Sequence, residues 1–317
     1  MNVYSMLTDA IRRRGDETAV ACGEKRLSYR AFDGVCAALD AWFAEKGCMP
    51  GDRVLLFIRN GLEFPALLMA AMRAGLVAVP TNAKLHPLEI AWIAGDAEPK
   101  LIFTHREYAQ DLRAALPASV AAEVIAIEDF RLPEPAAEPG VPAEVAPDDP
   151  AWIFYTSGTT GKPKGATLSH RNLIASSVNC LADVFDFRQS DRVLHVAPLS
   201  HGSGIYLIPA LARGAENIVH DRPAFRPDEV FDTVSALSIS VIAFVAPTMI
   251  VRLLEARPRD DIGSLRGVVY GGAAIHLEHI RAAVARFGPI FHQLYGQGEA
   301  PMTISGLPAR DHVDADD

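Results

Sequence analysis

The chain has 317 residues, of which 50% are hydrophobic and 22% are charged, and this composition excludes a protein that is disordered throughout. The formal net charge of −9 supplies no broad electropositive surface, so nucleic acid is not expected as a general partner. Small phosphorylated ligands stay open, because a local group of backbone N–H groups with one or two cations is enough to hold a phosphate.

The amino terminus contains Asp9 and three consecutive arginines and lacks the apolar segment of a secretory signal. The longest nearly apolar run, 241–251, is far shorter than the roughly 20 residues that cross a bilayer. We therefore expect no membrane span and a cytoplasmic location. The four cysteines form no CxxC pair, which predicts buried or idle thiols in a reducing compartment.

Short apolar runs typical of strands alternate along the chain with stretches of helical periodicity. The predicted strands are 53–58, 76–81, 100–104, 192–197, 216–220, 240–245, 266–270 and 290–294. The predicted helices are 62–73, 87–94, 106–115, 228–237 and 277–287. This alternation predicts an α/β fold with mostly parallel sheets flanked by helices.

A proline-rich stretch divides the sequence. Residues 132–150 contain six prolines, a composition that resists both helix interiors and central strands. We expect two packed α/β lobes, the first at 1–150 and ending in this linker or surface excursion, the second at 151–317. After Leu307 no helix or strand is predicted, so a carboxyl-terminal domain is expected to be absent.

The sharpest motif is residues 152–165, Trp-Ile-Phe-Tyr-Thr-Ser-Gly-Thr-Thr-Gly-Lys-Pro-Lys-Gly. An apolar strand runs into glycines that allow close backbone approach, hydroxyl groups that can surround phosphate oxygens, and lysines that offset their charge. The spacing is not that of a Walker A loop, because Gly158 and Gly161 are too close and Pro163 follows Lys162. The motif predicts a phosphate-binding loop of another kind; a hairpin without a ligand is the alternative.

The whole string resembles the signature of the adenylate-forming superfamily, which includes acyl-CoA synthetases, amino-acid adenylation domains and luciferases. The resemblance implies that a carboxylate attacks the α-phosphorus of ATP, and that a thiol then displaces AMP from the acyl-adenylate. It implies ATP, Mg²⁺ and CoA as co-substrates. It assigns to ATP the loop residues Thr156, Ser157, Gly158, Thr159, Thr160, Gly161 and Lys164.

A second segment of the family follows in the expected order. Residues 268–274 read as an apolar strand that ends in Gly-Gly-Ala, and two glycines let a flat base approach the backbone. The resemblance places Gly271, Gly272 and Ala273 against the adenine. A plain turn between a strand and a helix is the alternative.

Residues 295–299, Tyr-Gly-Gln-Gly-Glu, resemble the Tyr-Gly-x-Thr-Glu element of the family. The resemblance implies that Tyr295 and Gly296 lie near the adenine and that Glu299 binds Mg²⁺, a cation that prefers oxygen ligands. Gly298 departs from the usual threonine, whose hydroxyl contacts phosphate. We expect this loss to weaken catalysis without abolishing it.

Residues 197–204 resemble the family's Pro-Leu-x-His segment beside the acid. The resemblance places His201 at the acyl pocket, and the predicted catalytic residues are Lys164, His201 and Glu299. The acyl pocket is assigned to His201, Gly202, Ala246 and Ala274. No acidic residue lies in this segment to bind a substrate ammonium, so a plain organic acid is favoured over an amino acid.

The sequence therefore predicts an AMP-forming acyl-CoA ligase, present as an amino-terminal part that alone is inactive or weak. Two alternatives stay open: a nucleotide-binding remnant without catalysis, and an adenylation domain that loads a carrier protein. The sequence identifies neither the acid nor the oligomeric state, for which a homodimer is one option.

Overall fold

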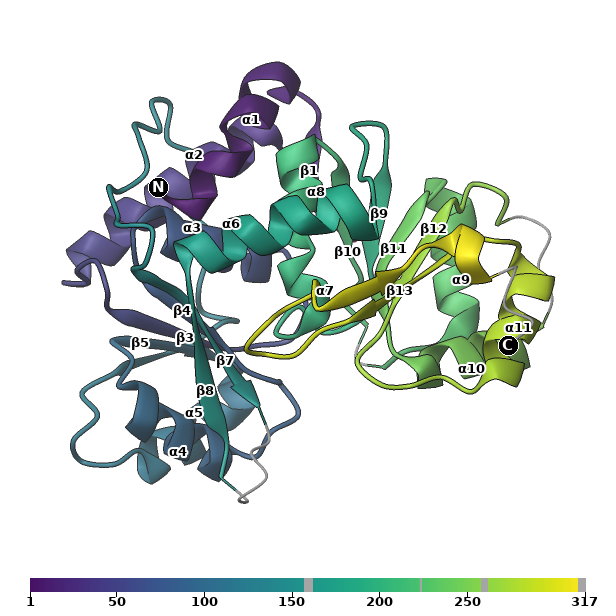
Figure 1. Ribbon diagram of the computed structural model, residues 1–317. Helices are drawn as coiled ribbons and strands as arrows, with labels where there is room; N and C mark the ends of the chain where they lie inside the picture. Colours follow the sequence, from purple (N-terminus) through teal and green to yellow (C-terminus); the bar gives the residue numbers. More distant parts are fainter. Residues whose placement is uncertain (157–161, 223, 258–261, 313–317) are drawn as a thin grey trace.

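The computed structural model describes residues 1–156, 162–222, 224–257 and 262–312, which form two sheets with helices around them (Figure 1). The first sheet has six strands in the order β6-β5-β3-β4-β7-β8. Its strands are β3 (Arg53–Phe57), β4 (Val77–Pro80), β5 (Leu101–Thr104), β6 (Glu123–Ala126), β7 (Pro150–Thr156) and β8 (Lys164–Ser169). All neighbouring pairs are parallel except β7 and β8.

The second sheet has eight strands in the order β14-β13-β12-β11-β9-β10-β1-β2, of which only the two edge pairings are antiparallel. Its strands are β1 (Thr18–Cys22), β2 (Lys25–Ser28), β9 (Arg192–His195), β10 (Glu216–Val219), β11 (Val241–Val245), β12 (Gly267–Tyr270), β13 (Phe291–Tyr295) and β14 (Ser305–Leu307). The predicted α/β fold with mostly parallel sheets is confirmed.

Helices cover both sheets. On the outer faces, α4 (Pro87–Ala97) and α5 (Arg106–Ala115) pack on the first sheet, and α9 (Pro227–Leu237), α10 (Pro247–Glu255) and α11 (Leu277–Phe287) pack on the second (Figure 1). The other α-helices of five or more residues in the described part of the chain are α1 (Thr8–Arg14), α2 (Tyr29–Glu45), α3 (Glu63–Arg73), α6 (His170–Asn179) and α8 (Leu207–Arg213). None of the helices in the described ranges is both long and apolar enough to cross a membrane.

One core joins the two sheets. The largest cluster of buried apolar side chains includes Leu56 of β3, Phe32 of α2 and Leu68 of α3, and it continues to Val193 of β9 and Leu207 of α8. Each of these side chains is fully buried. The two lobes are therefore packed through a continuous apolar interior rather than through a polar contact surface.

The predicted boundary at residue 150 lies at the start of β7, and each sheet takes strands from both sides of it. From the first part of the chain, β1 pairs with β10, with Val20 opposite Asn217. From the second part, β7 pairs with β4, with Trp152 opposite Ala78. The order of elements along the chain consequently differs from their grouping into sheets.

The proline-rich segment is held against the first lobe. The N–H group of Ala143 donates to the carbonyl of Arg73 at 2.8 Å, and the Asn2 amide donates to the carbonyl of Ala143 at 3.1 Å. The buried guanidinium of Arg73 donates to Asp40 at 2.7 Å and to the carbonyl of Gly140 at 3.1 Å. These contacts identify the segment as a surface excursion rather than a free linker.

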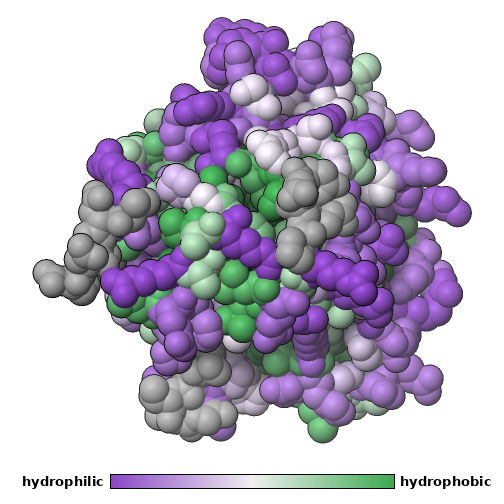
Figure 2. Space-filling model, turned by 90° about the vertical axis from the view of Figure 1, so that its right-hand side faces the viewer, coloured by the Kyte–Doolittle hydropathy of each residue, from purple (hydrophilic) through white to green (hydrophobic). Residues whose placement is uncertain are grey.

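The surface is uneven in polarity. On the side of the molecule that Figure 2 shows, apolar side chains gather in the centre and hydrophilic side chains surround them. The four cysteines lie in the interior instead, and all four are buried free thiols, as predicted.

Candidate active site

The predicted site segments follow the carboxyl ends of parallel strands. Residues 197–201 follow β9, Gly271 follows β12 and Gly296 follows β13, all in the second sheet, while Thr156 ends β7 of the first sheet. Ligands of open α/β sheets bind at this edge, because the loops that leave neighbouring parallel strands converge there. The fold therefore brings together four segments that are far apart in sequence.

A cavity of about 310 Å³ lies among these segments, and we call it the acid cavity. Four of the predicted residues line it: His201, Gly202, Gly272 and Gly296. Sequence reasoning missed its apolar walls, which are formed by Phe154, Ile205, Tyr206, Phe244, Leu294 and Met302. Ala246 and Ala274, predicted for the acyl pocket, are not among the described residues that line it.

His201 is held at the mouth of this cavity by two contacts. Its Nδ1 atom lies 2.9 Å from the hydroxyl of Ser200, and its ring meets the Phe154 ring edge-on at a centroid distance of 5.7 Å. Burial lowers the pKa of His201. A histidine with a lowered pKa is neutral at physiological pH, so the imidazole can line an acid site without a fixed charge.

The Gly271-Gly272 turn has a steric reason for each glycine. A Cβ atom on Gly271 would lie 2.6 Å from the carbonyl oxygen of Leu294 in β13, closer than real side chains allow. Gly272 has φ of +82°, a left-handed backbone conformation that favours glycine. Ala273 follows as an exposed residue. Gly271 is thus buried against β13, and the backbone that this turn leaves open to a ligand is that of Gly272 and Ala273.

The segment after β13 forms a tight turn. The N–H group of Gln297 donates to the carbonyl of Ala300 at 3.0 Å, and the reverse bond measures 3.2 Å. This turn presents Glu299 as an exposed carboxylate. The ring of Tyr295 is 51% exposed beside it, and its hydroxyl accepts from the amide of Gln297 at 3.0 Å.

The predicted phosphate loop joins two paired strands. Thr156 ends β7 directly opposite Lys164, the first residue of β8. Lys164 is exposed. A cavity of about 280 Å³, the hairpin cavity, is lined by Thr156, Ser200 and His201, so the end of the hairpin faces the histidine. The predicted ATP ligands between the strands lie outside the described residues; they are Ser157, Gly158, Thr159, Thr160 and Gly161.

Gly298 has a packing explanation that the sequence did not reveal. A Cβ atom at this position would lie 2.6 Å from Cγ2 of Thr156 and 2.8 Å from Cδ1 of Phe154. A threonine, as the family usually has, would therefore collide with the end of β7 unless both side chains moved. The glycine at this position therefore allows β7 to pack closely against the turn after β13.

A buried network beneath the site was also missed. The Nε2 atom of His195 donates to the amide oxygen of Asn217 at 3.0 Å, because the amide nitrogen of Asn217 donates to the carbonyls of Ala19 and Ala215. The Nδ1 atom of His195 consequently accepts from the hydroxyl of Ser203 at 3.0 Å. Ser203 belongs to α7 (Gly202–Ile205), so the network fixes the helix that follows His201.

This network predicts a pH dependence of stability. Burial lowers the pKa of His195 to about 4, against about 6.5 when the chain is unfolded. Protons therefore favour the unfolded chain, and His195 should make the free energy of unfolding about 2 kcal/mol lower at pH 5 than at pH 7. Urea unfolding at both values should show a smaller loss in His195→Gln, and the same loss as wild type in the exposed control His276→Gln. Equal losses in wild type and His195→Gln would contradict this.

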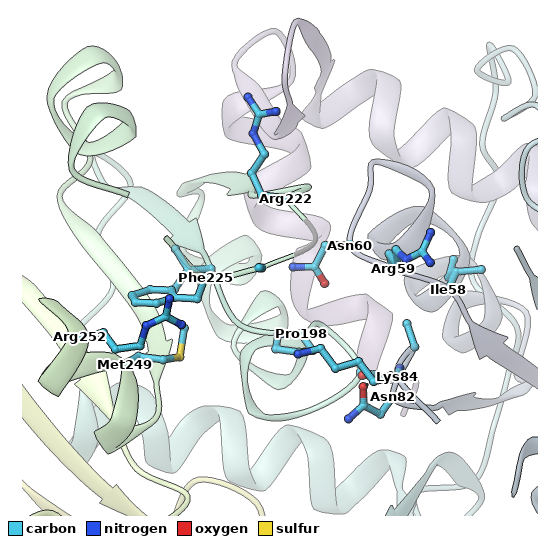
Figure 3. Close-up of a pocket in the computed structure, with 14 residues that line it drawn as sticks. Ile58, Arg59, Asn60, Asn82, Lys84, Pro198, Arg222, Phe225, Met249 and Arg252 are labelled. Carbon is cyan, nitrogen blue, oxygen red and sulfur yellow. Dashed lines mark hydrogen bonds between the residues drawn. The ribbon is translucent and has the colours of Figure 1, made fainter. Parts of the chain in front are cut away.

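A third cavity, of about 340 Å³, has four cations in its wall, and we call it the cation cavity. Lys84 approaches from one side, and Arg252 from the other, where its guanidinium lies 5.4 Å above the ring of Phe225 (Figure 3). The other two cations are Arg59 and Arg222, and the described lining includes no carboxylate. Ser200 lines both this cavity and the hairpin cavity.

No group of three or more histidine, cysteine, aspartate or glutamate residues in the described part of the chain could hold a metal ion by itself. The rings of His276 and His279, which are three residues apart, lie 5.7 Å from each other without such a third ligand.

Comparison with known proteins adds a family to this geometry. A sequence profile described as "AMP-binding enzyme" matches residues 7–316. A feruloyl-CoA synthase from an Amycolatopsis species is 35% identical over 302 residues, which cover 93% of this chain and 59% of the relative. The medium/long-chain-fatty-acid–CoA ligase FadD8 of Mycobacterium tuberculosis is 30% identical over 330 residues, covering 97% of this chain and 56% of the relative.

Solved structures agree with the observed fold. MatB from Rhodopseudomonas palustris superposes with a TM-score of 0.85 at 25% identity, over 97% of this chain and 62% of that one. The inhibitor-bound amino-terminal domain of FACL13 from Mycobacterium tuberculosis superposes with a TM-score of 0.84 at 25% identity, over 98% and 80%. This chain spans 56–59% of the length of the two curated relatives above. The matched profile and the convergent strand ends together show that the chain belongs to the family of AMP-binding enzymes.

Proposed function

We propose that this chain carries the ATP and acid sites of an AMP-forming acid–thiol ligase, which activates a carboxylic acid and passes it to CoA. The observation that carries the proposal is the convergence of the hairpin end, the Gly271-Gly272 turn, the Gly296–Glu299 turn and His201 around adjoining cavities. The names of relatives support the reaction class, since they include a feruloyl-CoA synthase, a fatty-acid–CoA ligase and an indoleacetate–CoA ligase.

The reaction makes modest demands on covalent chemistry. In the first step a carboxylate oxygen attacks the α-phosphorus of ATP and pyrophosphate leaves. In the second step a thiolate sulfur attacks the acyl carbon of the adenylate, and AMP leaves as the thioester forms. Both steps move negative charge among phosphate oxygens, so catalysis depends mainly on positioning and charge neutralisation.

The described residues suit these tasks. Thr156 and Lys164, opposite each other at the hairpin end, would offer a hydroxyl and an ammonium to the β- and γ-phosphates. The exposed backbone at Gly272 and Ala273 would receive the adenine, with Tyr295 beside it. The neutral His201 would line the acid.

A Mg²⁺ ion that accompanies ATP fits the donor set here. Mg²⁺ usually binds through one or two carboxylates together with phosphate oxygens and water, and Glu299 provides one exposed carboxylate without a partner among the described residues. The ion, when bound, would neutralise part of the polyphosphate charge. Glu299 would hold it at the tip of the Gln297–Ala300 turn, beside the hairpin end.

The cation cavity supports CoA as the thiol rather than a carrier protein. CoA brings several phosphate charges, and Lys84 and Arg252 face a cavity whose described lining offers no competing carboxylate. Ser200 connects this cavity to the hairpin cavity and His201, so an anchored acceptor could reach the acyl group through its flexible arm. We assign the phosphates of the acceptor to this cavity.

Titration calorimetry with ATP and Mg²⁺ tests the nucleotide site directly. We expect saturable binding by the wild-type chain, and affinity at least about tenfold lower in the double variant Lys164→Ala/Glu299→Ala, because two charged contacts to the phosphates are lost. The matched control Glu24→Ala/Lys25→Ala removes an exposed acid and an exposed lysine at the edge of the second sheet, away from the β7–β8 hairpin, and should bind ATP like wild type. Equal affinity in wild type and the test variant would contradict the assignment.

The rival from another class, a nucleotide-binding remnant, is separated by an acid-dependent readout. If the acid and the nucleotide bind side by side in one active site, a carboxylic acid should increase the affinity for ATP or AMP. A remnant that binds only the nucleotide should show no dependence on the acid.

A further inference from the structure

We propose that the acid cavity selects an uncharged aryl monocarboxylic acid, and that Phe244 sets this preference. The inference rests on the proposed function, because it names the class of acid that the same site takes. Some relatives are named for an aromatic acid and others for an aliphatic acid, so similarity alone does not choose between these two classes of acid.

The first reason is charge. None of the described residues that line the acid cavity is an aspartate, glutamate, lysine or arginine. Its histidine is neutral at physiological pH, since burial lowers the pKa of His201. A second carboxylate, a sulfonate or an ammonium on the substrate would lose its water in this cavity without gaining a counter-charge. The part of the acid beyond its reacting carboxylate is therefore uncharged.

The second reason is the shape of one wall. A Cβ atom on Gly202 would lie 3.2 Å from Cε2 and Cζ of Phe244, and a Cβ atom on Gly272 would lie 3.3 Å from Cζ. The ring of Phe244 thus lies against two glycines from different elements, the start of α7 and the turn after β12. No side chain separates the ring from either backbone, so the ring itself forms this part of the wall.

Other aromatic rings continue this wall. Tyr206 is fully buried, and its ring is stacked with that of Phe244 at a centroid distance of 6.5 Å and an interplanar angle of 27°. Phe154 contributes a further ring to the lining, edge-on to His201. Phe244 is partly exposed and lines the acid cavity, so part of its ring is within reach of a ligand.

A wall that contains aromatic rings favours a ring over a chain. Aromatic rings in offset or edge-to-face contact gain affinity beyond that of their buried area, by up to about tenfold for one good pair. An alkyl chain of equal carbon number cannot make this contact, and it loses more rotational freedom when it is confined. The cavity volume of about 310 Å³ leaves room for a substituted ring.

Three acyl-adenylate analogues separate the possibilities. They are 5′-O-(N-acylsulfamoyl)adenosines that carry a 3-phenylpropenoyl, a nonanoyl or a malonyl group; the first two have equal numbers of carbon atoms. We expect calorimetry on the 317-residue chain to give about tenfold tighter binding for phenylpropenoyl than for nonanoyl, and the weakest binding for malonyl.

Substitutions at the wall identify Phe244 as the cause. Phe244→Leu keeps an apolar side chain but removes the ring, and should reduce the phenylpropenoyl-to-nonanoyl preference to about twofold. Gly202→Ala places a methyl group against the same ring and should weaken phenylpropenoyl binding even if Phe244→Leu folds poorly. The control Phe287→Leu alters a half-buried ring on α11, away from the cavity, and should keep the tenfold preference.

Each result decides a separate claim. Equal or tighter binding of the nonanoyl analogue, or tightest binding of the malonyl analogue, would overturn this inference while the proposed function stands. A preference that survives Phe244→Leu, together with unchanged phenylpropenoyl binding by Gly202→Ala, would overturn the role of Phe244. If none of the three analogues binds, the adenosine part that they share is not recognised, and the proposed function falls together with the inference.

Discussion

Gly204→Ala is expected to abolish binding at the acid cavity and to lower the free energy of unfolding by about 3 kcal/mol. A Cβ atom at Gly204 would lie 1.8 Å from the carbonyl oxygen of Leu199, which is an impossible contact with backbone rather than with a flexible side chain. The segment cannot retreat easily, because the N–H group of Leu199 donates to the side-chain oxygen of Asn60 at 2.9 Å. The displacement would reach His201, two residues after Leu199.

Thermal and urea unfolding, together with titration of the phenylpropenoyl analogue, would measure both effects. Gly263→Ala is the matched control, because a Cβ atom there would meet nothing within 4 Å and the residue does not have positive φ. The control should unfold and bind like wild type. If Gly204→Ala also unfolded and bound like wild type, the turn that presents His201 would not require a glycine at position 204.

Asp191→Asn is expected to lower the free energy of unfolding by about 3 kcal/mol, because it leaves a partly buried guanidinium without its charge partner. Asp191 is 2% exposed and accepts from Nε of Arg266 at 2.8 Å, from the hydroxyl of Ser240 at 2.8 Å and from the N–H group of Arg188 at 2.7 Å. These contacts tie together the amino ends of β9, β11 and β12, opposite the edge that carries the site.

Urea unfolding at pH 7 would measure this loss. Asp148→Asn is the control, because its pair with Arg171 is exposed, with 76% and 62% of the two side chains accessible, and it should change stability by less than about 0.5 kcal/mol. Burial alone would raise the pKa of Asp191, but its bonds to Arg266 and the other donors outweigh burial and lower it. Its contribution to stability is therefore complete above about pH 4 and is lost as the pH falls further. Equal losses in the two variants would contradict the structural role of the buried pair.

Much of the fold could be predicted because parallel strands are buried on both faces. The run 53–58 reads as continuously apolar after Arg53, and all but that first residue of β3 are buried. Residues 197–201, Gly271 and Gly296 each follow the carboxyl end of a parallel strand whose apolar run the sequence shows. Thr156 and Lys164 were predicted as parts of one loop, and they lie opposite each other.

The rest depends on contacts that no local pattern reports. Phe244 lies within an apolar strand, and its residue type does not tell whether the ring faces the core or a cavity. The sequence did not indicate the buried network of His195 either, because its partners Asn217 and Ser203 lie in other elements. Gly298 was expected only to weaken catalysis, and the sequence did not show that a side chain there would meet Phe154 of the other sheet.

Each sheet contains strands from both parts of the sequence, and this has a consequence for folding during synthesis on the ribosome. The hairpin of β1 and β2 emerges first, yet β1 pairs with β10, about 200 residues later. At about 5–20 residues per second, this hairpin waits about 10–40 s with one edge unpaired. Its hydrogen-bonding groups and apolar side chains stay exposed during that time, so we expect the second sheet to close on this side only after β10 has been synthesised.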